Sequence, residues 1–368
     1  MKIEIVDLKK RYEDERKEIL KIIDKVLKKG HLVMTPEVSE FEKKITNYTG
    51  SKYCCSLNSG TDALMMALWA LGVKKNDEVI TSSLSFVATV GAIAHIGAKP
   101  VLIDVNEDLN INCDLIEKKI NKKTRVIMPV HWTGRMCDMD KVNYLAKKYD
   151  LFIIEDSAQA MGSYYKNKHS GKFSDISAFS CHPLKNLNAL GDGGFITTDN
   201  KKIYEKIKLY KNHGMSGRDQ VDVFGVNSRL DTIHASILSF RLLKLKKLIA
   251  KRKVNISLYK KYILTDKIKF IDDSTDSKSS YTIFNVLCEY RNELKNYLDQ
   301  NGIQSLIYYG KPLHFHKPMK KYGYKVGDYP KAEQLCKKVL ALPHNQYITE
   351  KQVKYVCNKI NNFYKSLK

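Results

Sequence analysis

The chain has 368 residues, of which 43% are hydrophobic and 28% charged, and its formal net charge is +23 at pH 7. This composition is that of a globular protein, and it excludes a disordered chain, a collagen-like repeat and a coiled coil. The length allows one large domain and a second, smaller one.

The positive charge is concentrated in the last third of the chain. From Arg241 to the end there are 27 basic and 10 acidic residues, a net charge of +17. Such a surplus suits nucleic acid, an acidic partner or an anionic small substrate. Only nine Arg stand against 54 Lys, whereas surfaces that read base edges favour Arg. Because the lysines of RLLKLKKLIAKRK alternate with Leu and Ile, we interpret them mainly as a solvated helix face. Attraction of a phosphorylated substrate is the first alternative, and nucleic acid the second.

Membrane, secretory and metal-binding segments are not predicted. No apolar run approaches the roughly 20 residues that span a bilayer. The start, MKIEIVDLKKRYEDERKEIL, mixes both charge signs and has no apolar region of the kind that a signal peptide contains. The eight cysteines form no C-x-x-C pair and no Cys/His pattern with zinc spacing. We therefore expect a reduced, metal-free, cytoplasmic protein.

Between about residues 50 and 200, short β-branched runs alternate with helical patterns. This alternation predicts an α/β fold with a large, doubly wound, mostly parallel sheet whose site lies at the carboxyl ends of the strands. One predicted helix is TDALMMALWALG, in which Leu64, Ala67, Leu68 and Leu71 share a face and Gly72 ends the helix. The predicted strands are DEVITSS (77–83), KPVLIDV (99–105), RVIMPVH (125–131), LFIIED (151–156), DISAFSCH (175–182) and GGFITTD (193–199).

Two domains are predicted. The first 45 residues have a helical pattern and are expected to join the sheet in a large domain of residues 1–240. Residues 241–368 are expected to form a smaller α+β domain that begins with a long basic helix. Within it, IDDSTDSKSS (271–280) is predicted to be a polar loop.

Two segments of the sheet domain can bind an anion or a cation. Asn58-Ser59-Gly60-Thr61 precedes a helix, where free N–H groups and the helix dipole favour an anion, although these residues also suit an ordinary N-cap. Glu155-Asp156-Ser157-Ala158-Gln159 ends a strand with two carboxylates. Such a pair serves equally well in an active site, as a helix cap or as a magnesium ligand.

Two further segments complete a coherent set. Lys185 follows a strand in Gly-rich surroundings and can form a Schiff base if it is partly desolvated. Phe86, after the DEVITSS strand, can stack on a flat ring, although a single Phe is usually a core residue. An anion anchor, a carboxylate, an amine and an aromatic face are the parts needed to hold pyridoxal phosphate. Neither a Walker loop nor a G-x-G-x-x-G after the first strand is present, so nucleotide-binding alternatives lack their motif.

Motifs along nearly the whole chain occur in a specific order. They are Pro36-Glu37-Val38, Phe41-Glu42, NSGTDAL, SFVAT, GAKPVLIDV, EDSAQA, HPLKNLNALGDGG, KNHG (211–214), NSRLDTIHASI (227–237), GIQSLIYYGKPLH (302–314) and ALPHNQYIT (341–349). With these motifs the sequence resembles the sugar aminotransferases of the DegT/DnrJ type, which belong to the fold type I group of pyridoxal-phosphate enzymes. The resemblance implies that fold, that cofactor and a homodimer with shared active sites.

The resemblance also implies a role for particular residues. Lys185 would hold the cofactor covalently and move the proton, and Asp156 would pair with the pyridinium nitrogen. The remaining implied positions are Gln159 near the ring oxygen, Phe86 on the ring, Gly60, Thr61 and Ser180 at the phosphate, Asn227 at the phosphate of the neighbouring subunit, and Arg229, Tyr309 and His314 near the sugar nucleotide.

The implied reaction moves an amino group from an amino acid, by family habit L-glutamate, to a keto sugar linked to a nucleoside diphosphate. Lys185 stands where dehydratase relatives have His, which favours transamination. The motif KNL…GDGG resembles that of enzymes that aminate C3 slightly more than that of enzymes that aminate C4. The product would belong to amino-sugar biosynthesis for a surface polysaccharide. Thr35, Trp132 and Met161 depart from the usual Gly, Tyr and His, and the last two, which are expected near the substrate pocket, leave the sugar open. The alternatives are another fold type I enzyme acting on a non-hexose keto substrate, and a basic nucleic-acid-binding protein.

Overall fold

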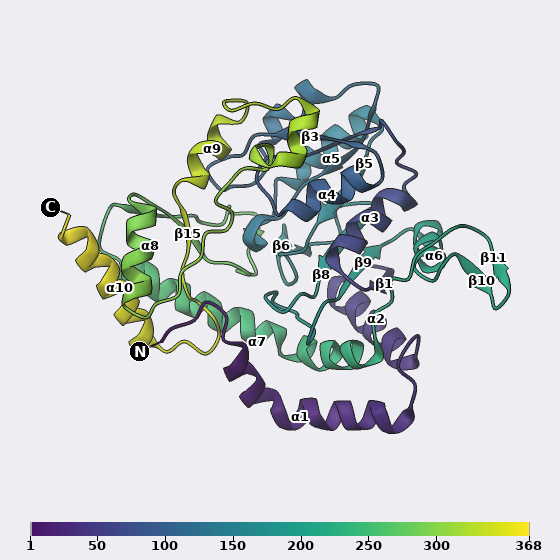
Figure 1. The fold of residues 1–368 in the computed structure, drawn as a ribbon, viewed down its shortest axis with the longest axis horizontal. Helices are drawn as coiled ribbons and strands as arrows, with labels where there is room; N and C mark the ends of the chain where they lie inside the picture. Colours follow the sequence, from purple (N-terminus) through teal and green to yellow (C-terminus); the bar gives the residue numbers. More distant parts are fainter. Residues whose placement is uncertain (1, 368) are drawn as a thin grey trace.

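The computed structural model describes residues 2–367, which form one seven-stranded sheet, two three-stranded sheets and one two-stranded sheet. The large sheet has seven strands, and Figure 1 shows helices on both sides of it. Five neighbouring strands run parallel, while β9 runs antiparallel to the two strands beside it. In spatial order the strands are β1 (Tyr53–Leu57), β9 (Gly194–Thr198), β8 (Ile176–Ser180), β5 (Phe152–Asp156), β4 (Thr124–Met128), β2 (Glu78–Ser82) and β3 (Lys99–Ile103).

The predicted doubly wound, mostly parallel sheet is confirmed, and so are all six predicted strands. β1 was not predicted; it pairs with β9 along its whole length, from Tyr53 opposite Thr198 to Leu57 opposite Gly194. The predicted helix is α3 (Gly60–Ala70), whose Leu64, Ala67 and Leu68 are buried. Leu71 is the C-cap, and Gly72 follows with a positive φ of 76°. Other helices beside this sheet include α4 (Val87–His95), α5 (Met139–Tyr149) and α6 (Lys201–Tyr210).

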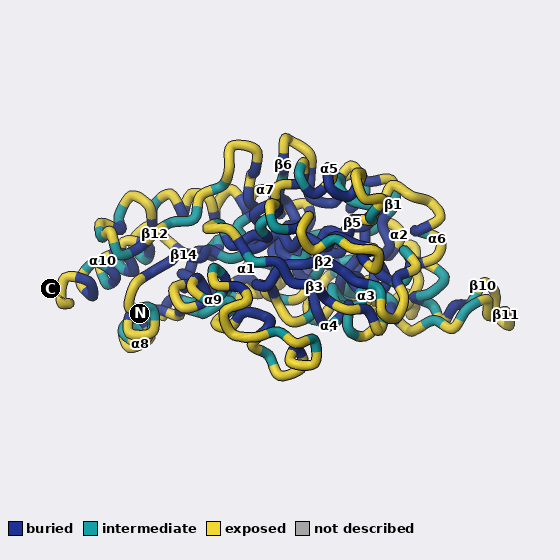
Figure 2. The backbone as a smooth tube through the Cα atoms, turned by 90° about the horizontal axis from the view of Figure 1, so that it is seen from above, coloured by how far each residue is buried: buried dark blue, intermediate teal, exposed yellow. Residues whose placement is uncertain are grey.

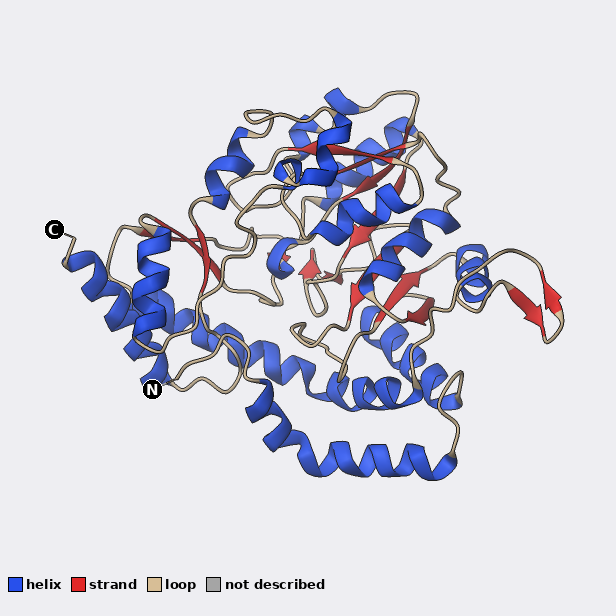
Figure 3. Cartoon of the chain, in the orientation of Figure 1, coloured by secondary structure: helices blue, strands red, loops and turns tan. Residues whose placement is uncertain are grey.

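One long helix, α7 (Thr232–Tyr262), runs through both cores (Figure 3). Leu238 and Leu245 pack in a cluster with α2 (Pro36–Thr49), whereas Ile256 and Tyr259 pack in the core of the small domain. The predicted basic helix therefore begins at Thr232, and the predicted domain boundary at residue 241 falls inside it. α1 (Leu8–Lys29) also contacts α7.

The small domain is built on an antiparallel sheet of three strands. Ile3 lies in its core and bridges to Ile303, so the start of the chain packs with its last third. The predicted polar loop 271–280 contains β13 (Ser277–Lys278), which pairs with β6 (Tyr164–Tyr165) of the large domain. The other elements of this domain are β12 (Ile268–Phe270), β14 (Asn285–Cys288), α8 (Arg291–Gln300), β15 (Val339–Ala341) and α10 (Glu350–Lys365), whereas α9 (Pro330–Cys336) packs in a cluster that also holds Leu84 and Leu102 of the large domain.

Short elements complete the chain. The hairpin of β10 (Met215–Gly217) and β11 (Gln220–Val221) stands away from the body in Figure 2, and Phe224 beyond it is 96% exposed. Between residues 2 and 367, no helix is long and apolar enough to cross a membrane. The remaining elements are β7 (Lys168–His169) and the 3-10 helices η1 (Cys113–Leu115), η2 (Glu117–Lys119), η3 (Trp132–Gly134), η4 (Leu313–Phe315) and η5 (Lys317–Tyr322).

Gly194, at the start of β9, lies so close to the backbone at the start of α3 that a side chain does not fit between them. A Cβ at Gly194 would lie 2.4 Å from the carbonyl of Ser59 and 2.7 Å from the nitrogen of Gly60. Gly194→Ala is therefore expected to displace the start of α3 and to lower the free energy of unfolding by about 1–3 kcal/mol, measured by urea denaturation. Gly191→Ala is the control, because the nearest atom to its Cβ, in His234, is 3.6 Å away. Equal losses in the two variants would contradict this reading.

Candidate active site

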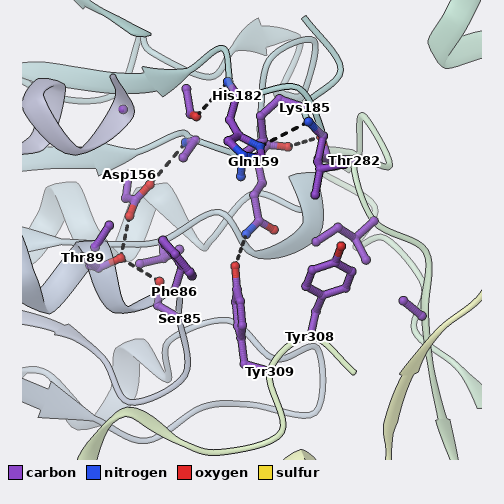
Figure 4. A pocket seen from close by; sticks show the side chains of 18 of the residues that line it. Ser85, Phe86, Thr89, Asp156, Gln159, His182, Lys185, Thr282, Tyr308 and Tyr309 are labelled. Carbon is purple, nitrogen blue, oxygen red and sulfur yellow. Dashed lines mark hydrogen bonds between the residues drawn. The ribbon is translucent and has the colours of Figure 1, made fainter. Parts of the chain in front are cut away.

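A cavity of about 290 Å³ lies where the carboxyl ends of the large sheet face the small domain. Its large-domain wall comes from the start of α3, the turn before α4, the end of β5 and the segment after β8. The opposite wall includes Thr282, Tyr308, Tyr309 and His344, together with Ile5 and Val6 from the start of the chain. Figure 4 shows the polar side chains that point into this space.

Lys185 lies on a turn that leaves β8 and returns toward β9. The turn is fixed by backbone hydrogen bonds from Cys181 to Gly193 (2.7 Å) and from Ala189 to Cys181 (2.8 Å). The side chain of Lys185 lines the cavity. Burial lowers the pKa of its amine to about 8, against the opposing effect of the Asp156 charge. About one amine in ten is therefore uncharged at pH 7, far more than for an ordinary lysine, and a nucleophile or a base acts in this uncharged form.

Asp156 and Glu155 end β5 and point to opposite faces of the sheet, because side chains alternate along a strand. Asp156 faces the cavity, where its Oδ2 accepts from the Thr89 hydroxyl (2.7 Å) and its Oδ1 from the Ala158 N–H (3.2 Å). Burial raises its pKa, although these hydrogen bonds act in the opposite direction. Asp156 is thus a buried acceptor aimed into the cavity.

Glu155 points into the core, where its hydrogen bonds hold neighbouring segments together. Burial acts to raise its pKa, but the hydrogen bond and charge of His131, with the Gly171 N–H and the Ser174 hydroxyl, lower that pKa to about 2. Its Oε1 lies 2.9 Å from His131 Nε2. The alternation of the strand therefore decides which of the two carboxylates belongs to the site.

The start of α3 forms an anion cradle. Ser59 is the N-cap and accepts from the Asp62 N–H at 3.0 Å, while the first helical N–H groups have no intrahelical acceptor. Ser180 ends β8 directly opposite, and a Cβ added to Gly60 would lie 2.7 Å from the Cβ of Ser180. Gly60, Thr61 and Ser180 all line the cavity, so the structure brings the three predicted phosphate ligands together.

Aromatic side chains form another part of the wall. Phe86 is 53% exposed at the N-cap of α4, and its ring lies 5.8 Å from that of Tyr309. Gln159 donates to the Tyr309 hydroxyl (3.3 Å) and accepts from the Thr133 N–H (2.7 Å). Trp132 is fully buried and packs edge-on against Tyr309 at 5.0 Å. An exposed aromatic face at this position suits a flat ring.

Three predicted site residues do not line this cavity. Asn227 and Arg229 lie in a separate hollow with Asn58, and Arg229 donates to the Asn212 side chain at 3.0 Å. His314 is buried in the wall behind the cavity, where its Nε2 lies 2.9 Å from Glu333 Oε1 and its ring packs against Tyr329. His314 therefore lies outside the lining of the cavity, and its expected approach to a substrate stays a prediction.

Residues that were not proposed as site residues also contribute. Thr89 holds Asp156, and the Ser85 hydroxyl lies 2.7 Å from that of Thr89. Their spacing of four residues, at the start of a helix after a strand, is the signal that could have identified them. Tyr308 and Thr282 add hydroxyl groups on the small-domain wall. The approach of the small domain to the sheet depends on tertiary structure, so no local pattern indicates these two.

The geometry is that of an enzyme that holds pyridoxal phosphate on a lysine. The chain belongs to the DegT/DnrJ/EryC1/StrS aminotransferase family, whose family model matches residues 13–361. The resemblance and the predicted cofactor are thereby confirmed, since similar solved structures include forms named for PLP and PMP. The residues of this cavity fit the cofactor: an amine of lowered pKa, a buried carboxylate acceptor and a cradle that a Cβ at Gly60 would fill.

Relatives cover essentially the whole chain. It is 36% identical to the dTDP-3-amino-3,6-dideoxy-alpha-D-galactopyranose transaminase of Aneurinibacillus thermoaerophilus, over 98% of this chain and 99% of the relative. It is 33% identical to the UDP-2-acetamido-2-deoxy-3-oxo-D-glucuronate aminotransferase of Pseudomonas aeruginosa, over 98% and 100%. The crystal structure of S. venezuelae DesV in complex with a ketimine intermediate superposes with a TM-score of 0.96 at 33% identity, covering 98% of both chains. The chain is a pyridoxal-phosphate-dependent aminotransferase.

The lowered pKa of Lys185 predicts how the protein without cofactor responds to pH. Below about 8 the amine is mostly charged, whereas an ordinary lysine stays charged to 10.5. The initial rate at which this form acquires a visible absorbance band with pyridoxal phosphate is expected to rise about tenfold per pH unit below pH 8 and to level off above it. Stopped-flow absorbance measures this rate, and Lys185→Ala supplies the background. A midpoint near 10.5 would contradict the desolvated amine.

Proposed function

We propose that this enzyme transfers the amino group of L-glutamate to a keto sugar linked to a nucleoside diphosphate, with C3 of a hexose favoured over C4. The names of two relatives support the sugar class, because one describes a dTDP-3-amino sugar and the other a UDP-linked 3-oxo sugar. The net charge of +23 also favours an anionic substrate over a neutral one.

The observation that carries the proposal is that Lys185 and Asp156 line one cavity with the cradle at the start of α3. Pyridoxal phosphate, when bound, supplies an electron-withdrawing ring and an aldehyde for the amine. Asp156 is placed to accept a hydrogen bond from a protonated ring nitrogen, and Gly60, Thr61 and Ser180 are placed to bind a phosphate. Phe86 covers a ring face, and Gln159 is held in the same wall by Tyr309 and Thr133.

Lys185 would act as the proton carrier in both halves of the reaction. A base is most effective when its pKa lies near the working pH, and burial brings the pKa of this amine to about 8. The Asp156 carboxylate favours the charged form of the same amine. Lys185 would therefore take a proton from the amino donor in the first half-reaction and deliver a proton to the sugar carbon in the second, within one cavity. Ping-pong kinetics are expected because the keto acid made from the donor leaves before the keto sugar enters the same cavity.

The proposal includes a homodimer in the cytoplasm. Asn227 and Arg229 lie in the hollow beside Asn58, outside the cavity of their own chain. The neighbouring segment is anchored by Ser228, whose hydroxyl accepts from the Asn58 N–H and donates to Asp62 of α3. We assign Asn227 to the phosphate of a second subunit and Arg229 to a sugar nucleotide. The product would be an activated amino sugar for a surface polysaccharide such as lipopolysaccharide or capsule.

A panel of nucleotide-linked keto sugars tests the substrate. With L-glutamate as donor, we expect 2-oxoglutarate and an amino sugar to form in equal amounts, fastest with 3-keto hexoses. Mass spectrometry of the sugar nucleotide measures the product, and L-alanine as donor is the control. Turnover confined to 4-keto sugars would overturn the preference for C3. Turnover confined to keto acids without a nucleotide would overturn the substrate class.

Lys185→Ala tests the catalytic assignment. The variant is expected to lose at least about 10³-fold in kcat, because no other amine at this position can carry the proton. It should still bind the pyridoxamine form of the cofactor, since the phosphate cradle and Asp156 are unchanged. Steady-state rates and the ultraviolet spectrum of the purified protein measure the two effects. Lys147→Ala, an exposed lysine of α5, is the matched control. A Lys185→Ala enzyme that transaminates normally would refute the assignment.

A further inference from the structure

A second cavity, of about 550 Å³, lies between α1, α7 and the segment that precedes α10. It is lined by four cationic side chains, Arg11, Lys244, Lys247 and Lys251, and by two carboxylates, Asp14 and Glu15. The three lysines belong to the basic run RLLKLKKLIAKRK, whose charge the amino-transfer site does not use. We call this cavity the α1–α7 groove.

The floor of the α1–α7 groove contains more buried positive charge than negative charge. Arg11 and Arg241 are each 5% exposed, and both bind one carboxylate, that of Glu15, at 3.3 Å and 2.8 Å. Arg252, also buried, does not line the groove but adds a third guanidinium near Arg11 and no negative charge. Burial and the charge of Arg241 lower the pKa of Arg11. A desolvated guanidinium that shares its only carboxylate favours an additional anion.

Two groups on the groove wall accept hydrogen bonds instead. The Oε1 of Gln346 is buried and, among the described residues, has no partner. Asp14 accepts from the Tyr347 hydroxyl at 3.4 Å and also lines the groove. Inorganic phosphate carries its O–H groups on the same small anion that the cations attract, and it has no separate hydroxyl groups to offer to Gln346 and Asp14. A phosphate ester that carries hydroxyl groups can offer its phosphate to the cations and its hydroxyls to Gln346 and Asp14.

We propose that the α1–α7 groove binds a phosphate ester that carries hydroxyl groups, with its phosphate at Arg11 and the lysines of α7. The groove is formed by α1 and α7, and none of its lining residues lines the amino-transfer cavity. It is a ligand site in addition to that of the substrate. The contacts of Arg241 with the carbonyl groups of Asn188 (2.7 Å) and Ala189 (3.1 Å) connect its floor to the segment that carries Lys185.

Calorimetric titration of the holoenzyme with glucose 1-phosphate and, separately, with inorganic phosphate tests this site. Saturable binding is expected for both, at least about tenfold tighter for the ester. Lys247→Ala/Lys251→Ala should weaken both affinities about tenfold or more, because two cations are removed. Lys246→Ala/Lys261→Ala is the matched control, since it removes the same charge from the same helix but outside the groove. The control variant should bind like the wild type.

The other outcomes overturn the proposal in whole or in part. Absence of saturable binding, or equal affinity in the two double variants, would show that the groove is not a phosphate site. Equal affinity for the two probes would leave a site for free phosphate and refute the role of the hydroxyl groups. Gln346→Leu separates these cases, because it should weaken the ester alone. Retention of the cofactor absorbance in every variant keeps the result independent of the amino-transfer proposal.

Discussion

Two oppositely charged groups that are both desolvated share the amino-transfer cavity, and the architecture is arranged to hold them there. Burial disfavours the charged form of both side chains, so the pKa of Lys185 is lowered and the pKa of Asp156 is raised. The two shifts are partly offset, since each charge stabilises the other and Thr89 donates to Asp156. A carboxylate that remains an acceptor and an amine that readily loses its proton are the pair that pyridoxal chemistry requires.

This arrangement follows from the connection of parallel strands. β5 and β8 are neighbours in the sheet and point the same way, so Asp156 at one carboxyl end and the segment after Ser180 at the other open toward the same space. α3 packs against β8 and begins beside Ser180, which places N–H groups of a helix start at that edge. The small domain then closes the cavity with Thr282 and Tyr308. The site depends on the order of the strands more than on any single loop.

The sequence allowed much of this to be predicted, because strand periodicity and motif order are local signals. The strands of the parallel sheet were predicted in that way, and so were Lys185, Asp156 and the start of α3, which the structure brings to one cavity. β1 was missed because YCCSL lacks β-branched residues, and its pairing with β9 is a tertiary effect. The start of α7 was placed too late because the lysines mark only its basic part. His314 was expected at a substrate, but burial and Glu333 turn its ring into the wall.

The role of α7 changes how the basic charge of this chain is understood. Its first half packs under the large sheet and its second half in the small domain, so the helix is the common support of both walls of the cavity. From its buried side, Arg241 binds carbonyl groups of Asn188 and Ala189, and Arg252 binds the side chain of Asn186, next to Lys185. Guanidinium groups suit this position because one planar fork can hold several carbonyl oxygens in fixed directions. The exposed lysines of the same helix face outward. A single helix thus positions the segment of Lys185 with its buried arginines, while three of its exposed lysines line the α1–α7 groove.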